Sequence, residues 1–209
     1  MLTVTLSLGG LLASGDVWAA DLAVTVKDAS GKAVADAAVF ALSTSGVAPP
    51  AKLRSATVEQ SDREFVPYVT IVQTGTSVTF PNRDPILHHV YSFSPAKTFE
   101  IKLYTGKSPG EIVFDKPGVV TLGCNIHDWM IGYVVVVDTP FFARTDSQGL
   151  ARLKDVPRGA YELRAWHPQQ RAAATAQQVT VEGAATADFV LDVTPRKAKY
   201  KPPLDRMKY

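Results

Sequence analysis

The 209-residue chain has little of several things that define common protein classes. Its single cysteine excludes an internal disulfide framework and any zinc site built from several thiolates. Four histidines are too few for a large multicopper cluster. Beyond the N-terminal segment, no run of residues is apolar enough to span a bilayer.

Strong charge of one sign is also missing, because the formal net charge is only +2. The positive charge that exists lies at the C-terminal end, where residues 195–209 carry six basic side chains against Asp205 alone. Residues 21–194 carry a net charge of −2, so the folded part gives no reason to expect nucleic-acid binding. We interpret residues 195–209 as a basic disordered tail.

The N-terminal segment has the pattern of a secretory leader. Residues 1–20 contain an apolar run too short for a spanning helix, closed by small residues before the polar Asp21. No Lys or Arg precedes the run, which departs from the usual leader, and a buried N-terminal strand is the alternative. We predict a signal peptide at residues 1–20, export to the periplasm, and no transmembrane segment in the mature chain.

What the chain has in abundance is short apolar runs bounded by Gly, Pro, Asn and Asp. Leu22, Val24 and Val26 alternate with polar residues as in a half-buried strand, and no window shows sustained helical periodicity. The sequence therefore predicts an all-β fold of the sandwich or barrel class. The small and polar residues 43–61, with a Pro pair, predict a linker or long loop. Strands are expected at 22–26, 39–42, within 65–80, and at 89–93, 99–103, 111–114, 119–122, 132–137, 142–145, 151–153, 161–166, 178–181 and 187–193.

One segment carries residues with metal chemistry. Cys124 is followed by an imidazole three residues later, His127, and by a thioether six residues later, Met130, on an expected loop between two strands. A thiolate, an imidazole and a weak thioether are the soft and borderline ligands that select copper. A mononuclear copper centre needs one further imidazole, and His88 and His89 both offer one from a separate strand.

Each of these residues has an ordinary structural role when it is taken alone. A lone cysteine such as Cys124 is usually a small, buried apolar residue. A lone histidine or methionine is usually packed in the core or exposed at the surface and binds no metal. Taken together, the spacing of Cys124, His127 and Met130 and the upstream histidine favour a metal site over these separate roles. We expect His127 at the exposed edge of the site, Trp129 as either a docking surface or an apolar plug, and Asp84 and Asp128 as turn caps.

The middle of the chain resembles the cupredoxins, the blue-copper electron-transfer family, over residues 61–138. The resemblance rests on the ligand segment and on the preceding pattern Phe65-x-Pro67, Gly75-Thr76-x-Val78-x-Phe80-x-Asn82-x-Asp84 and His88-x-Val90. It implies a Greek-key β-sandwich that holds one type 1 copper ion, with His88, Cys124, His127 and Met130 as the metal ligands. His89 stands where the family has an asparagine. The ligand spacing is similar to that of the amicyanins, the carriers of methylamine utilisation, and shorter than that of the plastocyanins.

The flanks resemble a second module, the carboxypeptidase regulatory-like, or transthyretin-like, sandwich. The matching residues are Val24-x-Val26-x-Asp28-x-x-Gly31 with Ala38-Val39, Thr145-Asp146-x-x-Gly149, and Asp155-Val156-Pro157-x-Gly159-x-Tyr161-x-Leu163. This resemblance implies a discontinuous small β-sandwich formed by residues 21–60 and 139–194, with the cupredoxin domain inserted between them. The alternative is an N-terminal extension followed by a separate C-terminal sandwich.

These resemblances imply a periplasmic one-electron carrier rather than an enzyme. Its partner would be a redox protein, a dehydrogenase or a cytochrome, and methylamine utilisation is one setting for it. The alternative is a periplasmic protein that stores or delivers copper through the same four residues. A structural scaffold that has lost metal binding is a third interpretation, against which the complete ligand set argues.

Overall fold

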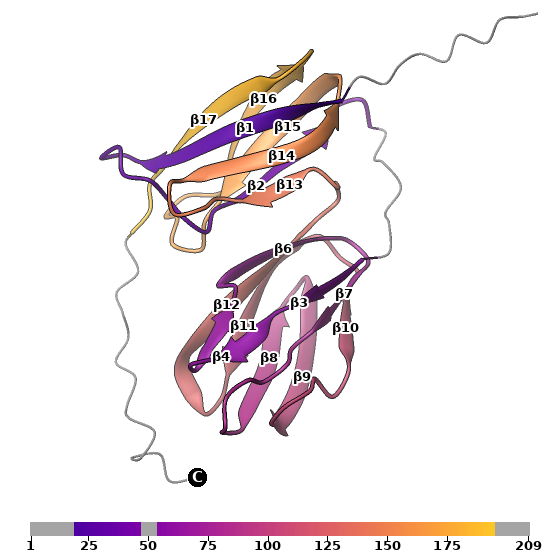
Figure 1. The fold of residues 1–209 in the computed structure, drawn as a ribbon, viewed down its shortest axis with the longest axis vertical. Helices are drawn as coiled ribbons and strands as arrows, with labels where there is room; N and C mark the ends of the chain where they lie inside the picture. The colour runs from indigo at the N-terminus through magenta and orange to yellow at the C-terminus, as the bar shows by residue number, and fades with distance from the viewer. Residues whose placement is uncertain (1–18, 47–53, 195–209) are drawn as a thin grey trace, which may run out of the picture.

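The computed structural model describes residues 19–46 and 54–194, and these are organised almost entirely as β-strands. The prediction of an all-β fold is confirmed, since the described residues contain no helix. Accordingly, the described residues contain no helix that is long and apolar enough to cross a membrane. The seventeen strands form two groups, one above the other in Figure 1.

The first group brings together the two ends of the described chain in two facing sheets. One sheet has the order β14-β1-β17 and the other the order β13-β2-β15-β16. Leu22, Val24 and Val26 alternate into the core between the sheets, as their period of two requires. The strands are β1 (Ala19–Asp28), β2 (Ala38–Ser43), β13 (Phe142–Arg144), β14 (Leu150–Pro157), β15 (Gly159–Trp166), β16 (Thr175–Val181) and β17 (Ala185–Leu191).

The second group holds the predicted metal ligands. Its main sheet has the order β6-β12-β11-β8-β9, and it packs with a sheet of order β10-β7-β3 and with the β4-β5 pair. The core between them is rich in Val and Phe. The strands are β3 (Ser55–Thr57), β4 (Glu59–Ser61), β5 (Glu64–Val66), β6 (Val69–Gln73), β7 (Thr76–Thr79), β8 (His88–Ser94), β9 (Lys97–Tyr104), β10 (Glu111–Phe114), β11 (Gly118–Cys124) and β12 (His127–Val137).

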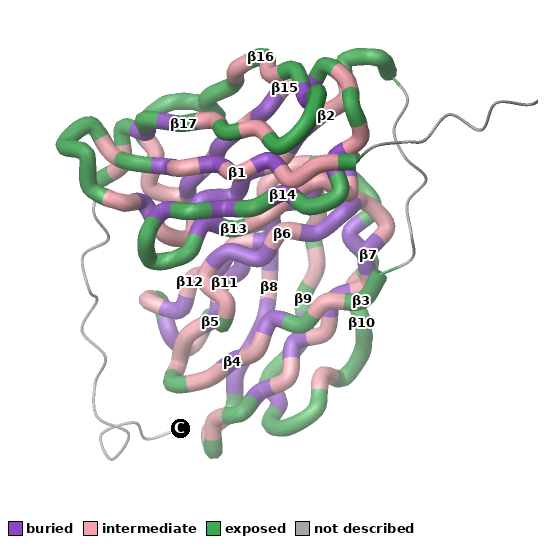
Figure 2. Tube along the Cα trace, turned by 45° about the horizontal axis from the view of Figure 1, so that its top comes forward, coloured by how far each residue is buried: buried purple, intermediate pink, exposed green. Residues whose placement is uncertain are grey.

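The C-terminal part of strand β12 is buried on both of its faces. Val134 and Val136 lie in the core of the second group, whereas Val135 and Val137 lie in a smaller cluster between the two groups. Because successive residues of a strand point to opposite faces, a continuous apolar run is what a doubly covered strand requires. Figure 2 shows buried segments running through both groups, with exposed segments on the outside.

The prediction of a linker over residues 43–61 is wrong for its second half. Residues 55–57 and 59–61 form β3 and β4, and β3 pairs in parallel with β7. Val58, between them, is buried in the core of the second group. The strands escaped prediction because they are only three residues long and mostly polar. The Pro49-Pro50 pair lies outside the described residues.

Two predictions fall wholly or mostly outside the described residues. The basic tail at 195–209 is not described, nor are residues 1–18 of the expected leader. Ala19 and Ala20, the last residues of that leader, begin β1 opposite Pro157 and Val156 of β14. The division into an inserted domain and discontinuous flanks stays a prediction.

Candidate metal centre

Cys124 and His127 face each other across the hairpin between β11 and β12. The register is irregular there: Gly123 pairs with Ile131, but the next residue, Cys124, pairs with His127. Residues 128–130 therefore have no opposite residue on β11. The short loop expected around Cys124 is instead a tight turn followed by this irregularity, which places the thiol and the imidazole on neighbouring strands.

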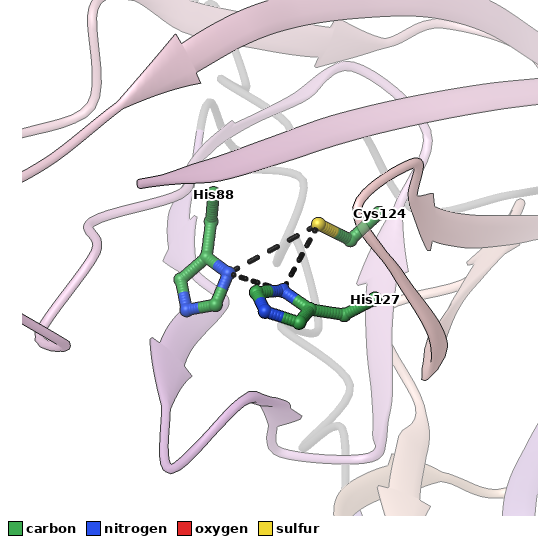
Figure 3. Close-up of side chains that lie close together, drawn as sticks. All are labelled: His88, Cys124 and His127. Carbon is green, nitrogen blue, oxygen red and sulfur yellow. Dashed lines mark hydrogen bonds between the residues drawn. The ribbon is translucent and has the colours of Figure 1, made fainter. Parts of the chain in front are cut away.

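His88 enters the site from β8, the strand that pairs with β11 on its other side. Its Nδ1 lies 4.0 Å from the Sγ of Cys124 and 3.1 Å from the Nδ1 of His127. The Sγ of Cys124 lies 3.7 Å from the Nδ1 of His127. Figure 3 shows the sulfur and the two imidazoles pointing toward one another. Three adjacent strands thus bring three potential ligand atoms within 4.8 Å of one another.

His89 points away from this cluster. Its Nε2 lies 2.9 Å from the Oε1 of Glu100 on β9. Consecutive residues of a strand face opposite sides of the sheet, so only one of the two neighbouring histidines can reach the thiol. The structure brings His88, and not His89, to Cys124.

Met130 is buried in β12 and belongs to the same hydrophobic core as Cys124. The two residues also line one surface pocket of about 570 Å³. This pocket lies on the side of the hairpin that also carries Tyr91 and Phe93 of β8. Met130 therefore shares a core and a pocket with Cys124, and its role as a fourth ligand stays a prediction.

The expectation that His127 forms the exposed edge of the site is wrong, because its side chain is fully buried. The ring of Trp129 lies against it, with ring centroids 5.2 Å apart, and Trp129 itself is half-buried. Burial lowers the pKa of His127 to about 4, and the nearby His88 and Arg63 add to this effect. The imidazole is therefore neutral near pH 7, as a metal ligand must be.

Asp84 has a role that the sequence did not reveal. Its carboxylate accepts hydrogen bonds from the backbone N–H groups of Asp62 and Arg63, which fits the predicted turn cap. Its Oδ2 also lies 2.7 Å from the Nε2 of His88. Burial opposes ionisation of Asp84, but these hydrogen bonds outweigh it and hold the pKa below its usual value.

The cluster of His88, Cys124 and His127 fits a soft or borderline metal ion. Bonds of about 2.0–2.3 Å to nitrogen and sulfur place such ligand atoms about 3.3–3.8 Å apart. The three observed separations lie between 3.1 and 4.0 Å. All three side chains are buried, so a bound ion would be shielded from water.

Comparisons with known proteins give structural similarities only, since no family model and no curated protein matches the chain. A purple cupredoxin from Nitrosopumilus maritimus is 24% identical, with a TM-score of 0.36 over 39% of this chain and 99% of its own. An oxidised point mutant of amicyanin is 19% identical, with a TM-score of 0.36 over 49% of this chain and 99% of its own.

A copper-containing nitrite reductase from Thermus scotoductus SA-01 is also similar, at 25% identity and a TM-score of 0.38. The match covers 44% of this chain and only 24% of the reductase. These three proteins are two cupredoxins and an enzyme, and they are some of the similar solved structures. TM-scores below 0.5 do not establish a family, so the site is interpreted from its own geometry.

Proposed function

We propose that this protein binds one copper ion in a type 1 site and carries single electrons between redox partners. The observation that supports this most directly is the buried convergence of one thiol and two imidazole nitrogens from three adjacent strands. Two imidazoles and a thiolate with a weak thioether are typical of blue-copper sites. His88, Cys124 and His127 are the proposed main ligands, and Met130 is the proposed axial ligand.

The bound ion would supply a reversible one-electron couple, and the chain would keep its surroundings nearly constant. His88 begins β8, Cys124 ends β11 and His127 begins β12, so each ligand is anchored in a paired strand. A sheet of this kind resists ligand movement, because a shift of one side chain would require changes in the packed core around it. Such resistance favours electron transfer with little rearrangement.

We further propose the setting in which this function operates. The carrier is exported to the periplasm by residues 1–20 and exchanges electrons with a dehydrogenase or a cytochrome. Methylamine utilisation is the proposed pathway class, and it is supported only by the spacing of Cys124, His127 and Met130. We propose no catalytic residue for this chain. The flanks at 21–60 and 139–194 are proposed to form the regulatory-like sandwich.

Spectroscopy of copper-loaded protein tests the function. We expect an intense visible thiolate-to-copper band and narrow copper hyperfine splitting in the paramagnetic-resonance spectrum. Cys124→Ser should abolish the band while circular dichroism shows that the fold persists. Copper binding with an unchanged spectrum in Cys124→Ser would refute the assignment.

The two adjacent histidines provide a matched pair of variants for the same experiment. His88→Gln should change the copper spectrum strongly, whereas His89→Gln should leave it unchanged, because His89 faces Glu100 instead of the cluster. A weakly coloured protein that passes Cu(I) readily to an acceptor would instead favour copper storage or delivery. A chain that binds no metal would leave only a structural role.

A further inference from the structure

The least expected contact near the metal centre is a carboxylate behind one of the proposed ligands. The Oδ2 of Asp84 lies 2.7 Å from the Nε2 of His88. The His88 side chain is fully buried and only 12% of the Asp84 side chain is exposed. A hydrogen bond in such surroundings is stronger than one in water and is not easily exchanged for a solvent contact.

Asp84 is itself held in place from two directions. The backbone N–H groups of Asp62 and Arg63 donate to its two carboxylate oxygens at 2.7 and 2.8 Å. Both donors lie in the turn between β4 and β5, with φ angles of 52° and 56°. Successive N–H groups in a left-handed turn can converge on one anion. The N–H of Asp84 donates to Asn82, whose side chain in turn donates to the backbone oxygen of Tyr104.

This arrangement places a hydrogen on the Nε2 of the His88 ring. An ionised carboxylate only accepts hydrogen bonds, so the Nε2 of His88 must carry a proton to bond with Asp84. In a neutral imidazole the Nδ1 is then a bare lone pair. That Nδ1 is the atom that lies 3.1 Å from His127 and 4.0 Å from the sulfur of Cys124.

We propose that Asp84 is a positioning residue of the metal centre, which selects the ligating tautomer of His88 and increases its electron donation. This inference rests on the proposed copper function. A carboxylate that accepts the outer N–H of a ligating histidine fixes its ring and raises its basicity. The negative charge stabilises the more positive oxidation state of a nearby ion. Asp84 thereby lowers the reduction potential of the site.

A merely structural role for Asp84, as a cap of the β4–β5 turn, predicts something different. It predicts lower stability in Asp84→Asn with no effect on the His88 ring or on the preference for Cu(II). The chain offers a matched control in Glu100, which bonds in the same way to the Nε2 of His89, a histidine that does not face the cluster. Glu100→Gln removes a carboxylate from the histidine one residue further along the strand, at a side chain that is 59% exposed against 12% for Asp84.

The first experiment uses the metal-free full chain and is independent of copper. Nitrogen chemical shifts of ¹⁵N-labelled protein report which ring nitrogen of each histidine carries the proton. We expect only the Nε2–H tautomer of His88 in the wild type, a mixture of both tautomers in Asp84→Asn, and the wild-type pattern in Glu100→Gln. An Nδ1–H tautomer or a ring protonated on both nitrogens in the wild type near pH 7, or an unaltered tautomer in Asp84→Asn, would overturn the proposal.

The second experiment measures Cu(II) and Cu(I) affinities and the reduction potential of the loaded protein. Asp84→Asn should weaken Cu(II) binding by about 10- to 100-fold, the usual loss when such a partner is removed. It should affect Cu(I) binding less and should therefore raise the potential. Asp84→Glu, which restores the charge, should return both quantities toward the wild type, and Glu100→Gln should leave them unchanged.

The two experiments distinguish a failure of the positioning role of Asp84 from a failure of the proposed copper function. Equal loss of Cu(II) and Cu(I) affinity in Asp84→Asn, or an equal shift of potential in Glu100→Gln, would contradict the positioning role. Failure of the wild type to bind copper would refute the proposed function, but the tautomer of His88 would still be decided. If Asp84→Asn does not fold, the wild-type tautomer still tests the proposal, because an Nδ1–H ring of His88 would overturn it.

Discussion

Gly123 allows the strand that carries Cys124 to pass beneath an aromatic ring. A Cβ at this position would lie 2.8 Å from the Cζ and 2.9 Å from the hydroxyl oxygen of Tyr91. The ring of Tyr91 is also in contact with the buried ring of His89, their centroids being 5.4 Å apart, which limits its freedom to move aside. Space, and not backbone conformation, therefore requires glycine at position 123, because the φ of Gly123 is not in the left-handed region.

Gly123→Ala should lower the free energy of unfolding by about 1–3 kcal/mol, the usual cost of adding a methyl group where there is no room. Because Gly123 precedes Cys124, the substitution should also change the visible band of the copper-loaded protein. Chemical denaturation and absorption spectroscopy measure the two effects. Tyr91→Ala in the same chain should relieve the clash, so additive losses of stability in the double variant would contradict this explanation.

His167 gives the first group of strands a dependence on pH. Its side chain is buried, and its Nδ1 accepts the backbone N–H of Gln169. Burial lowers the pKa of His167 below 6.5, although the nearby Asp36 opposes this, and Asp36 is itself paired with Arg144. The unfolded chain therefore binds a proton at His167 more readily than the folded chain does.

As the pH falls below 6.5, the wild type should lose stability through this residue, because protonation favours the unfolded state. His167→Gln removes the group and should lose less stability over the same range. Urea unfolding of both proteins at pH 7.5 and about pH 5 measures the difference. A gap in unfolding free energy between the wild type and the variant that stays constant with pH would show that His167 does not titrate in this way.

At the scale of single strands, β12 differs from the outer strands of the molecule. A strand with one solvated face has buried residues at every second position, but Val134 and Val135 of β12 are both buried. Each lies in a different cluster, Val134 in the core of the second group and Val135 between the groups. The strand that begins with His127 thus joins the candidate metal centre to the first group of strands.

Val134→Ala and Val135→Ala should each lower the free energy of unfolding by about 1.5–3 kcal/mol, from the lost apolar burial and the cavity left behind. Thr121→Ala, at an exposed position of the neighbouring β11, should change it by no more than about 0.5 kcal/mol. Denaturant titration of the three variants tests this comparison. A large effect at only one of the two valines would mean that β12 is covered on one face alone.

Much of the strand pattern was predictable from local sequence, because alternation and turn residues act over a few positions. Leu22, Val24 and Val26 show this for β1, whose alternation is confirmed by their burial. The strands β3 and β4 were missed because their pairing with β7 and β5 is not written in their own short, polar sequences. Local pattern carries no information about such partners.

The cluster of His88, Cys124 and His127 was predictable in its residue types but not in its surroundings. The spacing of Cys124 and His127 follows from ligand chemistry, whereas the choice of His88 over His89 came from the resemblance to the cupredoxins. The burial of His127 depends on the folded position of Trp129 and on groups from other strands, and spacing alone does not reveal it. The contact of Asp84 with His88 likewise depends on the conformation of the chain between them.

At the scale of the whole molecule, the two groups of strands meet through an aromatic contact. Trp166 of β15 packs edge-on against Tyr133 of β12, with ring centroids 5.7 Å apart. Tyr133 also packs against Tyr68, and the buried Val69 and Val135 complete the cluster. Apolar contact of this kind couples the unfolding of two cores, because separating them would expose the cluster to water.

Trp166→Ala should weaken this coupling without reaching the metal centre. We expect calorimetry to show one unfolding transition for the wild type, and for the variant two transitions or one broadened toward lower temperature, with a loss of about 2–4 kcal/mol. The visible band of the copper-loaded variant should remain unchanged, because its ligands lie on the second group alone. Phe93→Ala is the control, since its side chain is 81% exposed and its removal should leave the single transition intact. A Trp166→Ala variant that unfolds as sharply and at the same temperature as the wild type would show that the two groups are already independent.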